Sequence, residues 1–208
     1  MKQIDDLQFY IMTDSMMNRG YFRRGIMEKI KGLFVRDYIM AYLIAMRKIF
    51  FYSKRKGYIW RLMTIFNRYK FRRLGIKLGF SIPVDVFGYG LTIPHYGTIV
   101  VGEGNKIGNY CVLHTSTCIT AGRKIIGDAF YLSTGAKVIN SIELGDGVTI
   151  GANSVVNKSY EEDNCLIIGI PGYIKRSQKK WYINDGELYS ERVKRCEELR
   201  ESINHNEQ

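Results

Sequence analysis

The chain has 208 residues, which is enough for one main domain with a buried core and does not require a second large domain. Hydrophobic residues make up 46% and charged residues 25%, as in ordinary soluble proteins, but the formal net charge is +11. This charge indicates an anionic partner, which is a nucleic acid, a membrane surface or a phosphorylated substrate or cofactor.

Neither the cysteines nor the N-terminus indicates export or a metal centre. The four cysteines show no CxxC pair and no zinc-ligand spacing, and residues 1–10 lack a secretory signal pattern. The longest apolar uncharged stretch, residues 38–46, is far shorter than the ~20 residues of a spanning helix. We therefore expect a reduced, cytoplasmic protein without a metal site and without membrane-spanning helices.

The first region, residues 1–78, is predicted to be helical. Apolar residues recur at helical spacing from about Tyr21 to Leu74, and Gly57 and Gly75 are expected helix ends. The runs SKRKG at 53–57 and RYKFRR at 68–73 make this region basic as well as amphipathic. Two interpretations stay open: the helices pack on a neighbouring core with solvated Lys and Arg, or they contact a membrane surface.

The second region, residues 79–176, has a different period. Aliphatic residues recur mostly at steps of six, and glycine often follows them directly. This period is typical of a parallel β-helix, in which each hexad forms a short strand and a turn and its first residue points into the core. We expect glycine to be used at the corners because it tolerates their backbone conformation. The predicted core positions are Phe87, Ile93, Val101, Ile107, Leu113, Ile119, Ile126, Leu132, Val138, Leu144, Ile150 and Val156.

Two interruptions of the repeat point to a functional site. Two extra residues separate Ile93 from Val101, and one extra residue separates Ile119 from Ile126. If three hexads form one triangular coil, His95 in the larger insertion and His114 in the next coil lie on one edge, followed by Thr134 and Ala152. The coils are about 4.8 Å apart. A neutral imidazole lifted out of the wall at His95 can act as a base near pH 7. His114 either supports the site structurally or contacts the substrate.

The third region, residues 177–208, is short and charged. Asp185 is expected to cap a helix that runs to Arg200, and the mixed charges predict a segment that faces solvent or another subunit. His205 falls in the expected frayed tail, and we assign it no role.

The segment GYGLTIPHYGTIVVGEGNKIG resembles the left-handed β-helix, hexapeptide-repeat acyltransferases, in particular serine O-acetyltransferases and related enzymes of surface-polysaccharide synthesis. The resemblance covers about Leu74 to Arg176. It implies a mainly β fold, a left-handed parallel β-helix with an α-helical N-terminal region and a short C-terminal helix. It also implies a homotrimer with active sites between adjacent subunits.

The resemblance further implies acetyl transfer from acetyl-CoA to a hydroxyl, with His95 as the general base and no covalent acetyl-enzyme. Residues expected to bind acetyl-CoA are Thr134, Gly135 and Ala152 along the pantetheine arm, and Lys158, Lys175 and Arg176 at its nucleotide end. Residues expected to contact the acceptor are Pro94, Tyr96, His114 and Arg123.

The acceptor is where this chain departs from serine-specific relatives. They carry an Asp before the catalytic His, where this chain has Pro94, and their longer loop with an Arg-His pair is reduced here to TAGRK at 120–124. In one alternative, Arg123 or Lys124 binds the amino-acid carboxylate in place of the missing Arg-His pair. The alternative, which we place first, is a sugar or polysaccharide-precursor hydroxyl, which requires no such clamp.

Serine acetylation and a non-catalytic β-helix scaffold are the competing functions. Nucleic-acid binding is not expected, because the basic residues lie in helices without a binding motif.

Overall fold

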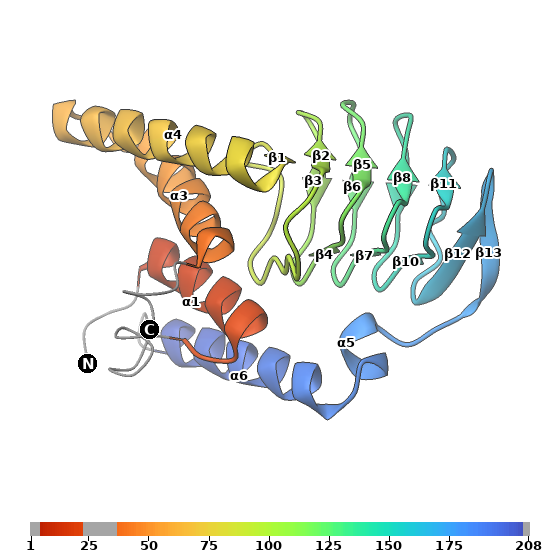
Figure 1. The fold of residues 1–208 in the computed structure, drawn as a ribbon. Helices are drawn as coiled ribbons and strands as arrows, with labels where there is room; N and C mark the ends of the chain where they lie inside the picture. The colour runs from red at the N-terminus through yellow and green to blue at the C-terminus, as the bar shows by residue number, and fades with distance from the viewer. Residues whose placement is uncertain (1–4, 23–36, 206–208) are drawn as a thin grey trace.

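The fold is a parallel β-helix with helices packed at one end and along one side (Figure 1). This computed structural model describes residues 5–22 and 37–205. The helices at the N-terminal end are α1 (Asp6–Arg19), α3 (Tyr38–Ser53) and α4 (Tyr58–Leu78). The strands follow as β1 (Phe80–Ser81), β2 (Ile99–Val101), β3 (Lys106–Ile107), β4 (Val112–Leu113), β5 (Thr117–Ile119), β6 (Ile125–Ile126), β7 (Tyr131–Leu132), β8 (Lys137–Val138), β9 (Glu143–Leu144), β10 (Thr149–Ile150), β11 (Val155–Val156), β12 (Cys165–Gly169) and β13 (Gly172–Ser177). The chain then forms α5 (Trp181–Asn184) and α6 (Glu187–Asn204).

The strands make three sheets that form the walls of the β-helix. Sheet I has the order β1-β2-β5-β8-β11, sheet II has β3-β6-β9, and sheet III has β13-β12-β10-β7-β4. All pairs are parallel except β12 with β13. Every predicted core position from Phe87 to Val156 is buried, and Leu113, Leu132 and Ile150 pair across sheet III. The predicted fold class is confirmed.

The glycines that follow the core positions have a different role from the one predicted. Gly127 does not have a positive φ; a Cβ there would lie 2.2 Å from the Asp146 side-chain oxygen of the next coil. That oxygen accepts a 2.7 Å hydrogen bond from the Asp128 backbone N–H. The left-handed position comes later in the turn and is taken by Ala129, with φ +58°. At such positions glycine is therefore needed for the close approach of two coils. The predicted conformational role is confirmed at later positions of the turns, where Gly104, Gly135 and Gly147 have a positive φ.

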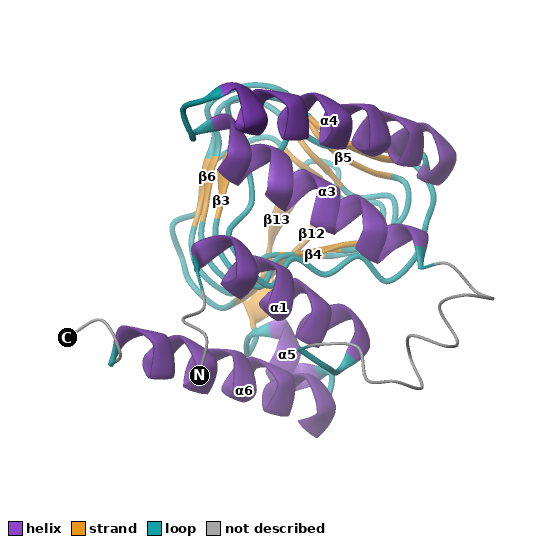
Figure 2. Cartoon of the chain, turned by 90° about the vertical axis from the view of Figure 1, so that its left-hand side faces the viewer, coloured by secondary structure: helices purple, strands orange, loops and turns teal. Residues whose placement is uncertain are grey.

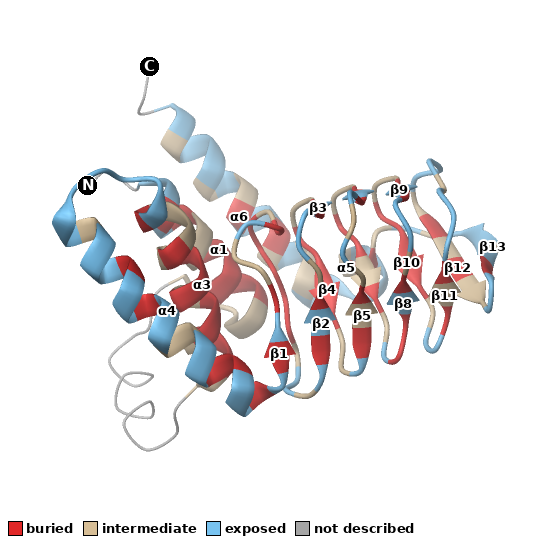
Figure 3. Ribbon diagram, turned by 90° about the horizontal axis from the view of Figure 1, so that it is seen from above, coloured by how far each residue is buried: buried red, intermediate tan, exposed pale blue. Residues whose placement is uncertain are grey.

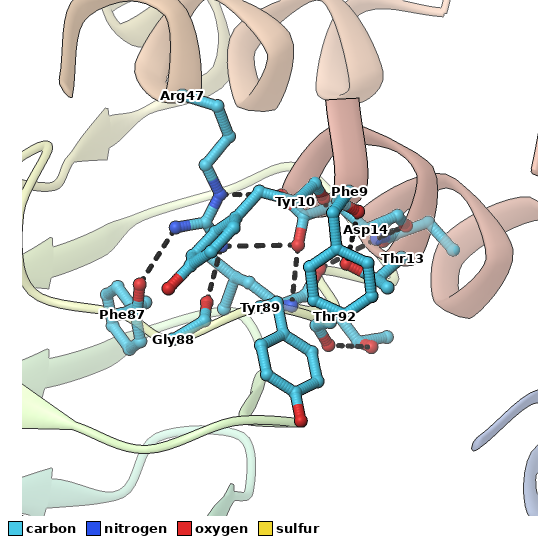
Figure 4. Close-up of polar contacts among 12 residues, drawn as sticks. Phe9, Tyr10, Thr13, Asp14, Arg47, Phe87, Gly88, Tyr89 and Thr92 are labelled. Atoms are coloured by element: carbon cyan, nitrogen blue, oxygen red, sulfur yellow. Dashed lines mark hydrogen bonds and ion pairs between the residues drawn. The ribbon is translucent and has the colours of Figure 1, made fainter. Parts of the chain in front are cut away.

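A buried ion pair joins the helices to the first coil (Figure 4). Arg47 on α3 donates to the Asp14 carboxylate on α1, with Nε and Oδ2 2.8 Å apart. The same guanidinium donates to the carbonyls of Phe87 and Gly88, and Asp14 accepts from the Leu91 N–H. Both side chains are 1% exposed, so this pairing satisfies charges that would otherwise be costly to bury.

The predicted helix ends are partly confirmed. Gly57 is the N-cap of α4, but Gly75 lies inside this helix, which ends at Leu78 with Gly79 as a left-handed C-cap. Glycine is needed at position 75 for another reason, because a Cβ there would lie 2.8 Å from the Phe80 carbonyl oxygen. Helix α1 lies within the region predicted to be helical, although it precedes the helical periodicity that starts at about Tyr21. Of the predicted helical region, residues 23–36 lie outside the described residues.

The C-terminal helix packs on its own chain rather than facing only solvent or another subunit. Helix α6 lies beneath α1 at the N-terminal end of the β-helix (Figures 1 and 2). Its Val193 and Cys196 are buried in a cluster with Trp181, and the Trp181 indole donates to the Tyr110 carbonyl. The predicted cap is also wrong: Gly186 is the N-cap, without a side-chain hydrogen bond, and Asp185 ends α5. Because α5 and α6 cover part of sheet III, sheets I and II keep the more open outer faces.

Helix α4 exposes much of its apolar surface (Figure 3). Its buried positions are Thr64, Asn67, Leu74, Gly75 and Leu78, whereas Ile59, Leu62, Phe66 and Tyr69, which recur at helical spacing, point to solvent. Packing on a neighbouring core therefore does not account for this face, whereas Phe71, Leu74 and Leu78 of α4 do pack against α3 and the core. Among the described helices, none combines the length and the apolar content that crossing a bilayer requires.

Candidate active site

His95 lies in a bulge at the corner where the chain passes from sheet III to sheet I. Thr92 pairs with Val112, and a Cβ on Gly97 would lie 3.1 Å from Thr115, so the regular register is lost and regained around residues 95 and 96. His95 and Tyr96 are both exposed, and Pro94 is half-buried. The two-residue insertion predicted from the sequence therefore places an imidazole and a phenol outside the wall.

Both ends of this bulge are held by helices. The Asn18 side chain of α1 donates to the Leu91 carbonyl at 2.8 Å and accepts from the Ile93 N–H at 3.0 Å. On the far side, the Gly97 N–H donates to the Leu78 carbonyl, which lies at the end of α4. The bulge is thus exposed in its middle and fixed at its edges, which suits a residue that must act in one orientation.

His114 lies in the next coil on the same edge, beside Pro94. Its ring is half-buried and packs against Tyr131, with ring centroids 5.0 Å apart. The pKa of His114 is lowered, first by burial and then by the positive charge of His95, while Asp185 acts in the opposite direction. His114 is therefore held mainly neutral at pH 7 and can donate or accept one hydrogen bond next to His95.

Small residues continue this edge through the later coils. We name the turns at residues 94–98, 114–116, 133–136 and 151–154 the histidine corner. Thr134 and Ala152 are exposed there, and the Asn153 N–H donates to the Thr134 carbonyl. The strand register sets Ser133 and Gly151 opposite His114, one residue earlier than the predicted Thr134 and Ala152. Gly135 is buried and has φ +75°, a left-handed conformation that favours glycine, and its contact with acetyl-CoA stays a prediction.

The predicted phosphate-binding residues lie at the far end of the β-helix. Lys158 is exposed and lines one hollow with the turn at residues 169–173, which contains a cis Ile170–Pro171 peptide bond. Lys175 and Arg176 are exposed on β13, the edge strand that follows this turn. We call these three cations the basic end of the β-helix. The last turn of the histidine corner contacts the turn at residues 169–173, since the Gly169 N–H donates to the Ser154 hydroxyl oxygen at 2.9 Å.

The predicted acceptor clamp is not assembled within one chain. Arg123 is exposed, but it lies at the corner between sheets I and II, away from the histidine corner. Lys124 is fully buried, and its ammonium donates to the Thr120 and Ala121 carbonyls. Lys124 therefore stabilises its own loop and does not bind the acceptor carboxylate. Within the described residues, no three His, Cys, Asp or Glu side chains lie close enough together to hold a metal ion, and all four cysteines are free.

The arrangement fits base-assisted transfer to a nucleophile better than covalent catalysis. Three of the four cysteines do not suit nucleophilic attack, because Cys111, Cys165 and Cys196 are buried and burial raises their pKa values. An exposed imidazole with a neutral neighbour can instead take a proton from a bound hydroxyl. Sequence reasoning found both histidines but missed Asn18 and the nearby charge of Asp185, which approach the corner from distant parts of the chain.

Curated relatives of this chain are serine acetyltransferases. It is 30% identical over 131 residues to the enzyme of Synechococcus elongatus, covering 59% of this chain and 50% of that one. It is 28% identical over 191 residues to the enzyme of Buchnera aphidicola, covering 83% of this chain and 69% of that one. The chain thus spans about half the length of the first of these relatives. No family model matches it.

Solved structures of serine acetyltransferases share the fold. The enzyme of Brucella abortus in complex with coenzyme A has a TM-score of 0.57 at 20% identity, over 84% of this chain and 68% of that one. At this identity the likeness shows the fold. It agrees with the β-helix, the N-terminal helices and the C-terminal helix described above.

Proposed function

We propose that this protein is an acetyl-CoA-dependent O-acetyltransferase of the serine acetyltransferase type, with His95 as the general base. One observation carries the proposal: an exposed imidazole lies in a bulge held at both edges, beside a neutral His114, at the start of an edge of small residues. The similarity to serine acetyltransferases, one of them solved with coenzyme A, supports the same reaction class.

The proposed reaction is a direct transfer. His95 takes the proton of the acceptor hydroxyl as its oxygen attacks the thioester carbonyl carbon of acetyl-CoA. The tetrahedral intermediate then collapses with cleavage of the carbon–sulfur bond, and the imidazolium returns the proton to the leaving thiolate. The products are an O-acetyl ester and free coenzyme A. His114, neutral and half-buried, orients the acceptor or the His95 ring.

The histidine corner fits the long, thin shape of the acetyl-CoA substrate. Thr134 and Ala152 are exposed and small, so an extended pantetheine arm can lie along them without displacing a bulky side chain. Lys158, Lys175 and Arg176 lie exposed at the basic end and would pair with the phosphates. In this arrangement the thioester lies at the histidine end.

Serine is the acceptor that the comparisons favour, although sequence reasoning placed a sugar first. The named relatives are serine acetyltransferases, and none is a polysaccharide enzyme. A carbohydrate hydroxyl stays a second candidate for one reason. Pro94, which has neither a charge nor an N–H, takes the position of the Asp found in serine-specific relatives. The buried Lys124 ammonium donates to a carbonyl of its own loop and does not reach an acceptor. A clamp for an amino acid must then come from elsewhere.

A homotrimer supplies that clamp in our proposal. Sheet III is partly covered by α5 and α6, so a partner would pack on the more open sheets I and II. A closed three-fold arrangement would bring the partner subunit's Arg123 towards the histidine corner. Light scattering that finds a fully active monomer would contradict this arrangement. A cytoplasmic location, where acetyl-CoA is present, completes the proposal.

Thiol release from acetyl-CoA tests the reaction. We expect His95→Ala to keep the fold and to lower turnover by roughly 100-fold or more, the usual effect of losing a general base. His114→Ala is expected to lower it less. Near-normal turnover of His95→Ala with an unchanged pH profile would contradict the assignment.

An acceptor screen separates the remaining alternatives. L-serine, nucleotide sugars and oligosaccharides are offered to the purified full chain, and the products are identified by mass spectrometry. Pro94→Asp should improve the use of serine if the missing carboxylate limits recognition. Failure with every acceptor, together with no binding of coenzyme A, would favour a non-catalytic scaffold.

A further inference from the structure

The outward face of α4 is a continuous apolar stripe. Tyr58, Leu62, Ile65, Tyr69 and Ile76 follow one another at steps of four, three, four and seven residues, which places them on one side of the helix. Ile59, Met63 and Phe66 widen the stripe, and the eight side chains are between 40% and 77% exposed. The inward face is mixed, since Thr64 and Asn67 are buried there together with Leu74, Gly75 and Leu78.

Positive charge accompanies this stripe. The segment 38–84 contains eleven Lys and Arg and neither Asp nor Glu. Twenty Lys and Arg in the rest of the chain balance its twenty Asp and Glu, so the net charge of +11 is carried by this segment alone. On α4, Arg61, Arg68 and Arg72 flank one side of the stripe, and Lys77 flanks the other, at helical spacing.

This combination has the properties of a helix that binds at a lipid–water interface. The helix is 21 residues long, roughly 30 Å. An apolar stripe inserts among acyl chains, while flanking Arg and Lys reach phosphate headgroups through their flexible stems. Tyr58 and Tyr69 suit the boundary between these layers, since each has an apolar ring and a polar tip.

Other partners fit the face less well. A second copy of α4 in a two-fold contact would set two rows of Arg and Lys against each other without a carboxylate on either helix. A nucleic acid would satisfy the charges and leave eight exposed apolar side chains without a role. An anionic bilayer matches both the charge and the apolar stripe.

We infer that α4 lies in the plane of an anionic membrane surface, with the Tyr58–Ile76 stripe inserted and the flanking Arg and Lys on lipid phosphates. This binding is peripheral and independent of the proposed reaction. It also has a geometric consequence for the site, because the Leu78 carbonyl at the end of α4 binds the Gly97 N–H. The bulge that carries His95 is thereby fixed to the end of the membrane-binding helix.

Vesicle flotation of the full chain tests the inference. We expect binding to phosphatidylcholine vesicles that contain phosphatidylglycerol, about tenfold or more weaker binding to phosphatidylcholine alone, and loss of binding at high salt. Ile65→Ser with Phe66→Ser should weaken binding about tenfold or more by removing inserted apolar surface. Arg61→Gln with Arg68→Gln should also weaken it about tenfold.

Matched variants outside α4 serve as controls. Leu188→Ser removes an exposed apolar side chain from α6, and Lys179→Gln with Lys194→Gln removes two exposed positive charges. These variants should bind vesicles like the unaltered chain, and thermal unfolding checks that every variant is folded. The inference is overturned if no vesicle is bound, if neutral and anionic vesicles bind equally, or if α4 variants and controls behave alike. It is also overturned if Ile65→Ser with Phe66→Ser dissociates an oligomer without affecting vesicle binding.

Discussion

At the scale of single residues, the chain shows which positions of the candidate site a local pattern can identify. His95 was predictable because two extra residues interrupt a strict six-residue period, and a side chain in such an insertion must leave the wall. No pattern in the sequence identifies Asn18 as part of the site. Its two partners, Leu91 and Ile93, lie 73 and 75 residues further along the chain, and only the fold brings them to α1.

We predict that Asn18 positions the catalytic bulge. Asn18→Ala leaves the Ile93 N–H and the Leu91 carbonyl without their partner, so the segment before His95 loses its anchor. We expect kcat to fall about tenfold or more with a smaller change in KM, because displacing a reacting group by about 1 Å can cost 100-fold. Asn184→Ala, an exposed amide on α5, is the control. Equal kcat values for the two variants would contradict this role.

A second residue-scale prediction concerns the protonation of His114. Its pKa lies below the ordinary value of 6.5, and the positive charge of His95 is one cause. NMR titration should therefore find His114 protonating below pH 6.5, and His95→Ala should raise its pKa. A folded-state pKa below the unfolded value means that the unfolded chain binds the proton first, so His114 lowers stability as the pH falls below about 6.5. His114→Gln should flatten this part of the stability profile, and an unchanged profile would contradict the assignment.

At the scale of the elements, the period of the sequence predicted the strands and their core positions but not the detail of the turns. Asn109, Asp128, Asp146 and Asp163 form a column in which the backbone N–H of each of the first three donates to the side chain of the next. The sequence shows only that a polar residue often follows glycine. The distance between coils that makes glycine necessary is a property of the assembled β-helix.

Gly127→Ala is therefore expected to destabilise the β-helix by about 2 kcal/mol or more, the range of overpacked cores. The added Cβ would lie 2.2 Å from the Asp146 Oδ1 and 2.8 Å from the Asp146 backbone N, and the backbone cannot move aside without disturbing the next coil. Denaturant unfolding measures the change. Lys106→Ala, on the exposed face of β3, should alter stability by less than about 0.5 kcal/mol. A similar small effect of Gly127→Ala would show that the coils can separate easily.

At the scale of the whole molecule, the helices and the β-helix share two apolar clusters. Buried residues of α3 and α4 belong to the same apolar cluster as the core positions of the coils, and α1 and α6 share a second cluster with sheet III. The six-residue period could not predict that the helices pack on the β-helix. The period relates each coil to the next and contains no information on what covers the first coil. Asp14 and Arg47 make that connection from α1 and α3.

We predict that the Asp14–Arg47 pair couples the unfolding of the helices to that of the β-helix. Arg47→Leu would leave the buried Asp14 carboxylate without a counter-ion and the Phe87 and Gly88 carbonyls without a donor. Removing one member of a buried pair costs about 3 to 5 kcal/mol. Arg47→Leu with Asp14→Leu should cost less than the sum of the single changes, because neither charge is then stranded. Circular dichroism during urea unfolding should show a single transition for the unaltered chain and an earlier loss of helical signal for Arg47→Leu. Additive costs in the double variant, or an unchanged midpoint for Arg47→Leu, would contradict the coupling.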